Sequence, residues 1–167
     1  MLSKRFFMNG IYLIIGGNMG ERENNLLECK DLIIKAIGEI IKESPIYETA
    51  AWGKTDQPSF LNQVFFLESN LNPHQILATC LAIESKMGRI RHEKWEARKI
   101  DIDILLFNDE VIDEEDLSIP HPHMKNRRFV LKPLTDIAPD VLHPVYNKTI
   151  KELLQHCSDP LEVTRFK

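Results

Sequence analysis

The sequence has few cysteines and no long apolar segment. Its three cysteines, Cys29, Cys80 and Cys157, lie far apart, and none of them forms a Cys-x-x-Cys pair. This number and spacing disfavour a disulfide scaffold or a structural zinc site and favour a reducing, cytoplasmic setting. No apolar run approaches the roughly 18 residues that a helix needs to cross a membrane, so we expect no membrane-spanning segment.

Neither sign of charge dominates this chain of 167 residues. It carries 21 basic and 25 acidic residues, a formal net charge of −4, and 43% of its residues are hydrophobic. Such a composition is typical of one folded domain with a substantial core and not of a disordered chain. We expect residues 1–10 to form an N-terminal tail and residues 11–167 to form a single domain. The tail lacks the apolar region of a secretory signal, and translation could start at Met1 or at Met8.

Basic residues are concentrated in one segment of this mildly acidic chain. Between residues 86 and 99, two acidic residues and six basic ones give a local net charge of +4, the basic ones being Lys86, Arg89, Arg91, Lys94, Arg98 and Lys99. A basic segment in an acidic protein favours a localised anion-binding site over a broad nucleic-acid surface. The segment could equally be a solvated loop, so its role depends on what lies beside it.

Hydrophobic periodicity predicts strands and helices in alternation. We expect strands at residues 11–15, 44–49, 60–68 and 100–107, and helices at residues 26–41, 73–87, 126–134 and 150–156. Asn72, Pro73 and Gln75 give the second helix a capping-box start, and Gly88 is its expected end. The order β-α-β-β-α-β predicts an α+β fold of the ferredoxin-like, split βαβ type, a mostly antiparallel sheet with helices covering one face.

Two acidic residues lie in the predicted strand 100–107. Because side chains alternate along a strand, its even-numbered residues, from Ile100 to Leu106, should share the core side. Asp101 and Asp103 then share the other side, with Cα atoms roughly 6.5 to 7 Å apart, and Leu105 and Phe107 extend that side. Two carboxylates at this spacing repel each other unless a cation lies between them, and Mg²⁺ often takes one or two carboxylates together with substrate phosphates. The alternative is a strand whose second face is simply wet.

The basic segment directly precedes this acidic pair in the chain. Its arginines could surround a polyphosphate, because a planar guanidinium binds phosphate oxygens in pairs, and Trp95 amid these charges favours a mobile lid. No Walker A sequence is present, since the glycine-rich run Gly16-Gly17-Asn18-Met19-Gly20 lacks the Gly-Lys-Ser/Thr ending of a P-loop. We therefore expect Mg²⁺–nucleotide chemistry in which dispersed arginines and metal ions hold the nucleotide.

Further motifs surround the acidic pair. The most diagnostic are Arg98-Lys99-Ile100-Asp101-Ile102-Asp103-Ile104-Leu105-Leu106-Phe107 and Ile119-Pro120-His121-Pro122-His123-Met124 with Arg127. Supporting segments are residues 16–20, 47–49, 56–58 and 60–62, together with Glu84, Gly88 and Arg89. In this order, over residues 11–154, the chain resembles the 6-hydroxymethyl-7,8-dihydropterin pyrophosphokinase family of folate biosynthesis.

This resemblance implies a specific reaction and a specific site. The family transfers the β,γ-diphosphate of ATP to the hydroxymethyl group of a reduced pterin and releases AMP, with two Mg²⁺ ions held at the positions of Asp101 and Asp103. By the same resemblance, the ATP-site positions are Arg89, Arg91, Trp95, Arg98, Ile104, His121 and Arg127, and the pterin-site positions are Thr49, Trp52, Phe60, Asn62, Asp101 and Phe129. Arg89 and Arg98 join the two aspartates as expected catalytic residues. The implied partners are small-molecule substrates, without nucleic acid or membrane, and a monomer is compatible with the sequence, which leaves the oligomeric state open.

Some positions depart from the family pattern, and other interpretations stay open. The departures are Asp116, where some members carry an arginine, Ala50, Trp52 and the pair Glu96-Ala97. A split βαβ sheet can also be an RNA-binding module, although no RNP-like run is present and two aspartates on the sheet would repel phosphate. A catalytically silent relative is a third interpretation, against which the aspartate pair argues. Without the family, Phe60 and Phe129 would be expected in the core, and His121 with His123 could form a transition-metal site.

Overall fold

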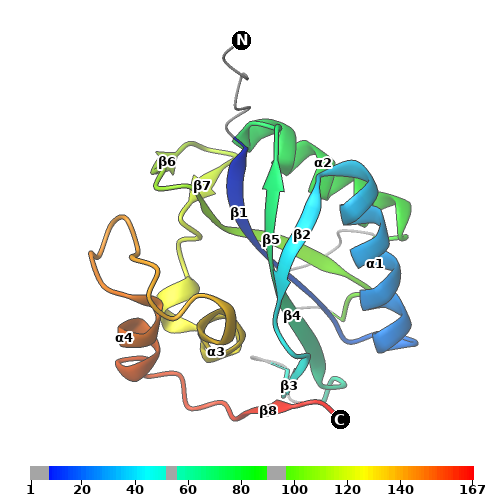
Figure 1. The fold of residues 1–167 in the computed structure, drawn as a ribbon. Coiled ribbons are helices and arrows are strands. Elements are labelled where there is room, and N and C mark those ends of the chain that lie inside the picture. The colour runs from blue at the N-terminus through cyan, green and yellow to red at the C-terminus, as the bar shows by residue number, and fades with distance from the viewer. Residues whose placement is uncertain (1–7, 52–55, 90–96) are drawn as a thin grey trace.

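A six-stranded sheet forms the centre of the protein, whose computed structural model describes residues 8–51, 56–89 and 97–167. Its strands are β1 (Asn9–Gly17), β2 (Glu39–Glu43), β3 (Tyr47–Thr49), β4 (Phe60–Ser69), β5 (Asp101–Phe107) and β8 (Val163–Arg165). Their order is β5-β1-β4-β3-β8, and β2 pairs with a separate stretch of β4 (Figure 1). Every described strand pair is antiparallel, which confirms the predicted sheet.

Helices cover both faces of this sheet. On one face lie α1 (Arg22–Ala36) and α2 (Pro73–Lys86), and on the other lie α3 (Arg128–Ile137) and α4 (Ile150–Gln155) (Figure 1). The predicted single helical layer is therefore wrong. The reason lies in the central strands, because Ile15 and Phe65 belong to the α1/α2 core while Ile14 and Val64 belong to the α3/α4 core. Strands that are apolar on both faces need a cover on each.

The first helix ends earlier than the periodic pattern predicts. The pattern continues to residue 41, but α1 ends at Ala36 and the next residues enter β2. Between them, Gly38 lies so close to β4 that a Cβ there would stand 2.1 Å from the Glu68 carbonyl oxygen. Ile40 is β-branched, which suits a strand, and it still packs against the α1/α2 core. The predicted strand at residues 44–49 is correspondingly shortened to β3.

The second helix begins and ends as predicted, and its end has a consequence for the site. At its start, Asn72 Oδ1 accepts from the Gln75 backbone N–H and Gln75 Oε1 accepts from the Asn72 backbone N–H, each over 2.9 Å. At its end, Gly88 has a φ of +86°, and Arg89 donates its backbone N–H to the Glu84 carbonyl over 3.0 Å. This is the glycine-terminated Schellman arrangement, and it sets Arg89 at the end of α2.

The C-terminal third adds elements that the sequence did not indicate. A two-stranded sheet forms from β6 (Ile112–Asp113) and β7 (Ser118–Ile119), and the 3-10 helix η1 (Met124–Asn126) precedes α3. The last element predicted from the sequence is the helix at residues 150–156, whereas β8 follows it and pairs with β3. This pairing supports the strand that carries Thr49. Within the described ranges, no helix is long and apolar enough to cross a membrane.

Candidate active site

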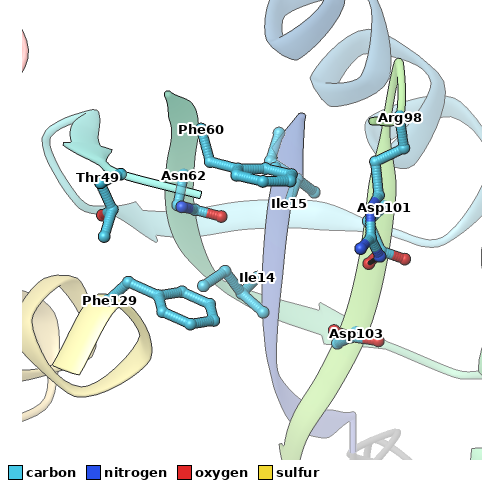
Figure 2. Close-up of a pocket in the computed structure, with 11 residues that line it drawn as sticks. Ile14, Ile15, Thr49, Phe60, Asn62, Arg98, Asp101, Asp103 and Phe129 are labelled. Atoms are coloured by element: carbon cyan, nitrogen blue, oxygen red, sulfur yellow. Dashed lines mark hydrogen bonds and ion pairs between the residues drawn. The ribbon is translucent and has the colours of Figure 1, made fainter. Parts of the chain in front are cut away.

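Asp101 and Asp103 share one side of β5, as the alternation predicts. They pair with Gly16 and Ile14 of β1, respectively, and both border the same pocket (Figure 2). Their neighbour Ile102 is buried in the α1/α2 core on the opposite side. The strand therefore presents two carboxylates to the pocket and fixes their spacing through the sheet.

The predicted alternation fails beyond Leu105. A β-bulge interrupts the pairing of β5 with β1 between Tyr12 and Leu13, so that Leu106 and not Leu105 lies opposite Tyr12. Leu106 consequently joins the α3/α4 core and Phe107 joins the α1/α2 core. The predicted sides of these two residues are wrong, because an extra residue in a strand reverses the facing of everything after it.

Asp101 is held between two arginines. Arg98 donates from Nη1 to Asp101 Oδ2 over 2.7 Å (Figure 2), and Arg89 donates from Nη1 to Oδ1. Burial opposes the ionisation of Asp101, but the two guanidinium groups outweigh it and lower the pKa of this carboxyl. The charge of Asp101 is therefore already compensated in the free protein.

Asp103 lies in a different environment only two residues away. Burial, followed by the negative charge of Asp101, raises the pKa of Asp103 to about 7. His121 Nε2 lies 4.0 Å from Asp103 Oδ2. Burial, together with the nearby Arg127, lowers the pKa of His121 to about 4, so this imidazole is neutral and does not compensate Asp103. Of the two carboxylates, Asp103 has the most to gain from a bound cation.

The donor set at this pair fits Mg²⁺. In the parts of the chain that the structure describes, no group of three or more His, Cys, Asp or Glu side chains is arranged to hold a metal. A closed zinc-type site needs about four protein ligands, which argues against the transition-metal interpretation of His121 and His123. Mg²⁺ instead keeps several waters and commonly takes one or two carboxylates plus substrate phosphates. The aspartate pair suits a metal that shares its ligands with a phosphate-bearing substrate.

A mainly apolar pocket adjoins the acidic pair. Phe60 of β4 and Phe129 of α3 face it from opposite sides, and Asn62 lies between them (Figure 2). Gly16 makes room for Asn62, because a Cβ at Gly16 would stand 2.1 Å from Asn62 Oδ1. Flat aromatic faces around an amide suit a planar heterocycle that carries donors and acceptors on its edge.

Thr49 provides an unpartnered polar atom in this pocket. The residue is 3% exposed, and its Oγ1 is the one buried side-chain polar atom among the described residues that lacks a hydrogen-bond partner. A buried hydroxyl without a partner costs about 1–3 kcal/mol. Such an atom at a pocket wall is available to hydrogen-bond a ligand.

The glycine-rich run at the end of β1 holds the segment that carries Arg98. A Cβ at Gly17 would stand 2.2 Å from the Lys99 carbonyl oxygen, so only glycine permits this approach. Asn18 Oδ1 accepts from the Arg98 backbone N–H over 2.9 Å, and the Asn18 N–H donates to the Arg98 carbonyl over 3.0 Å. The run therefore contacts the protein backbone at residues 98 and 99, a role that does not need a P-loop ending.

The structure brings most of the predicted site residues together. Those that line the pocket are Thr49, Phe60, Asn62, Arg98, Asp101, Asp103 and Phe129. Arg89, His121 and Arg127 interact with the aspartates from outside this lining. The Ile104 side chain, by contrast, is buried in the α1/α2 core away from the pocket. Trp52, Arg91 and Trp95 lie outside the described residues.

Glu84 belongs to this site, although no role was assigned to it from the sequence. It lies on α2, is 2% exposed, and its Oε1 is 2.6 Å from Arg89 Nη1 and accepts from the Ile102 backbone N–H over 2.8 Å. Burial, together with the charge and hydrogen bond of Asp101, raises the pKa of Glu84 against the opposing effects of that N–H and of Arg89. The signal that could have identified it is an acid among the buried residues of α2, beside Cys80 and Ile83.

Two carboxylates accompanied by arginines, beside an aromatic pocket, are the groups of a metal- and nucleotide-dependent phosphotransferase. The family model described as 7,8-dihydro-6-hydroxymethylpterin-pyrophosphokinase (HPPK) matches residues 12–139. The chain therefore belongs to the HPPK family.

Two relatives agree with this assignment over most of their length, and a solved structure agrees with it over about half of its own chain. The 2-amino-4-hydroxy-6-hydroxymethyldihydropteridine pyrophosphokinase of Aquifex aeolicus (strain VF5) is 41% identical over 145 residues, which cover 87% of this chain and 90% of the relative. The protein of the same name from Bacillus subtilis (strain 168) is 43% identical over 136 residues, covering 80% of this chain and 81% of the relative. A crystal structure of Plasmodium falciparum HPPK-DHPS matches 92% of this chain and 46% of its own, with a TM-score of 0.73 and 21% identity. This structural likeness confirms the predicted fold class.

Proposed function

We propose that Asp101 and Asp103 form the metal-binding centre of an ATP-dependent diphosphotransferase. As a member of the HPPK family, the protein transfers a diphosphate from ATP to 6-hydroxymethyl-7,8-dihydropterin in folate synthesis. The pterin hydroxyl oxygen bonds to the β-phosphorus and loses its proton to solvent, the bond from that phosphorus to the oxygen bridging it to the α-phosphorus breaks, and AMP leaves with that oxygen. The observation that carries the residue assignment is the acidic pair on one side of β5, at the wall of the aromatic pocket.

On the ATP side, two Mg²⁺ ions at Asp101 and Asp103 would neutralise the triphosphate and clamp the oxygens that attack and leave. The chain's own contribution is a set of fixed positive charges. Arg98 and Arg89 already lie within hydrogen-bond distance of Asp101, so a triphosphate that shares cations with this carboxylate comes within their reach. Arg98, which also borders the pocket, is the group best placed to stabilise charge that develops between the two substrates.

On the pterin side, Phe60 and Phe129 sandwich the ring while Asn62 and the Thr49 hydroxyl bind its polar edge. Support comes from the opposed phenylalanine rings, from the space that Gly16 leaves for Asn62, and from the unpartnered Thr49 Oγ1. Because Asp101 and Asp103 border the same pocket, a ring held there has its hydroxymethyl group near the acidic pair. This arrangement brings acceptor and donor together, which is where much of the rate enhancement in such transfers arises.

Substrate-dependent AMP formation tests this function directly. The protein is mixed with ATP, Mg²⁺ and 6-hydroxymethyl-7,8-dihydropterin, and nucleotide products are separated. We expect AMP, and we expect it to require both the pterin and Mg²⁺. Formation of ADP, or no product at all, would reject the proposal. Tightly bound RNA without turnover would favour the RNA-binding interpretation, which family membership does not support.

The setting proposed for this reaction is a reducing, cytoplasmic one. All three cysteines are free and buried, so the fold does not depend on disulfides. The partners proposed are the two small-molecule substrates and the metal ions.

A further inference from the structure

The carboxyl group of Glu84 contacts three parts of the active site, namely Arg89, the backbone of β5 and the side chain of Asp101. Its Oε1 is 2.6 Å from Arg89 Nη1 and accepts the backbone N–H of Ile102, the residue between Asp101 and Asp103, over 2.8 Å. Strand β5 lies at the edge of the sheet, so its outward-facing N–H groups need partners from outside the sheet. Glu84 supplies such a partner for the N–H of Ile102, which lies between the two aspartates and sets their spacing.

The end of α2 adds a second link between Glu84 and Arg89. The Arg89 backbone N–H donates to the Glu84 carbonyl over 3.0 Å, and the positive φ of Gly88 turns the chain to make this contact. The same turn returns the Arg89 side chain to the Glu84 carboxylate. Arg89 is therefore bound to α2 through its backbone and its guanidinium, and its other carboxylate partner is Asp101.

The two carboxylate partners of Arg89 are not equivalent. Asp101 borders the pocket and is a proposed metal ligand, whereas the side chain of Glu84 is 3% exposed and does not line the pocket. A cation at Asp101 repels a guanidinium that shares the same carboxylate. Glu84 is then the partner that remains to hold Arg89 beside the phosphates.

We propose that Glu84 is a positioning residue for the diphosphate transfer, holding Arg89 and the backbone between Asp101 and Asp103 in place while Asp101 binds metal. The inference rests on the proposed function of those two aspartates. It assigns Glu84 no contact with either substrate, so Glu84 acts through Arg89, Ile102 and its hydrogen bond with Asp101. Two measurements separate this role from a general contribution to folding.

Amide hydrogen exchange in the free protein tests the backbone contact without reference to activity. Glu84→Ala removes the acceptor of the Ile102 N–H and should speed exchange of that amide by about tenfold, whereas Glu84→Gln retains an acceptor oxygen and should leave the rate near that of the wild type. Asn72→Ala is the matched control, because it removes a cap at the other end of α2 and should not affect Ile102 selectively. An Ile102 amide that exchanges at the wild-type rate in Glu84→Ala would overturn the proposal.

A double-mutant cycle with Arg89 tests the effect on the reaction. Glu84→Gln should lower kcat for AMP formation by about tenfold or more with the KM for pterin changed less than about twofold, and it should have little further effect in an Arg89→Ala background. Unchanged kcat in Glu84→Gln, or losses that add fully across the two sites, would refute a role through Arg89. If Glu84→Ala does not fold, the isosteric Gln variant still decides the cycle. Absence of AMP formation by the wild type would count against the proposed function and leave the exchange result to judge the Ile102 contact.

Discussion

Replacing Asp103 by asparagine should separate activity from stability. The substitution keeps the size and polarity of the side chain and removes its charge. In the free protein that charge is poorly compensated, because burial and the neighbouring Asp101 raise the pKa of Asp103 to about 7. In the proposed reaction the same charge holds a metal ion. We therefore expect Asp103→Asn to lose activity while its melting temperature, measured without Mg²⁺, is maintained or raised.

The expected loss of activity follows from the metal assignment. A metal clamp is worth several kcal/mol in the transition state, and each decade of rate corresponds to about 1.36 kcal/mol. A loss of more than about 10²-fold in kcat/KM, or about 3 kcal/mol, is therefore expected for Asp103→Asn and for Asp101→Asn. The two variants should differ in stability, because Asp101→Asn also removes the anion that Arg89 and Arg98 share. Near-normal turnover in both variants would refute the metal assignment.

The pH dependence of stability gives an independent test of Asp103. Its pKa in the folded protein, about 7, is above the 3.8 of an ordinary aspartate carboxyl. Its contribution to stability is thus fully present below about pH 4 and is lost as the pH rises to about 7. Asparagine lacks this titration, so the melting temperature of Asp103→Asn minus that of the wild type should grow between pH 4 and 7 and level off above. Calorimetry at several pH values measures it, with the exposed Asp113→Asn as control. A difference that stays flat or shrinks over this range would contradict the raised pKa.

Three further substitutions test other parts of the site. Arg98→Ala should lower kcat by about 10²-fold while weakening the binding of a non-hydrolysable ATP analogue much less, because its guanidinium is used mainly in the transition state. Steady-state kinetics measures the loss of kcat and binding calorimetry measures the affinity for the analogue. A change confined to KM would count against this role. Asn62→Ala should raise the KM for pterin by about tenfold or more and leave the KM for ATP nearly unchanged, because it removes partners of the ring edge; an equal rise for both substrates would place Asn62 outside the pterin site. Gly17→Ala should destabilise the fold by about 1–3 kcal/mol, because the added Cβ would stand 2.2 Å from the Lys99 carbonyl oxygen; urea unfolding measures it, and an unchanged midpoint would contradict this close approach.

The parts of the fold that sequence could predict are those set by local patterns. The capping box of α2, its glycine end and the shared side of Asp101 and Asp103 depend on residues within a few positions of one another. The helix that was predicted too long fails for a physical reason, since Ile40 packs against the same core as α1 and extends its apolar period into β2. The periodicity therefore correctly predicted that Ile40 packs against the core, but it wrongly predicted a helix where the structure has a strand.

Features that depend on two distant segments could not be predicted in this way. The bulge opposite Tyr12 is a property of the register between β1 and β5, and it alone moves Leu106 and Phe107 to the sides they occupy. Strand β8 is three residues long and depends on its pairing with β3, so it leaves no periodic pattern. Glu84 is similar, because the Ile102 N–H and the Arg89 guanidinium meet its carboxylate only in the folded protein.

The difference between the two aspartates shows where local pattern ends and tertiary structure begins. Both are the same residue type on the same side of one strand, yet the pKa of Asp101 is lowered and that of Asp103 is raised. Arg89 comes from the end of α2 and Arg98 from the segment before β5, and both bind Asp101 at the start of the strand. Two residues further along, Asp103 lies 4.0 Å from the neutral His121, and the charges of Arg127 and Arg89 do not outweigh burial and the negative charge of Asp101. Strand periodicity is thus sufficient to bring two carboxylates to one pocket. Arg89 and Arg98, which only the complete fold places beside Asp101, decide that the charge of Asp101 is compensated in the free protein. The charge of Asp103 is the one that a metal ion would stabilise.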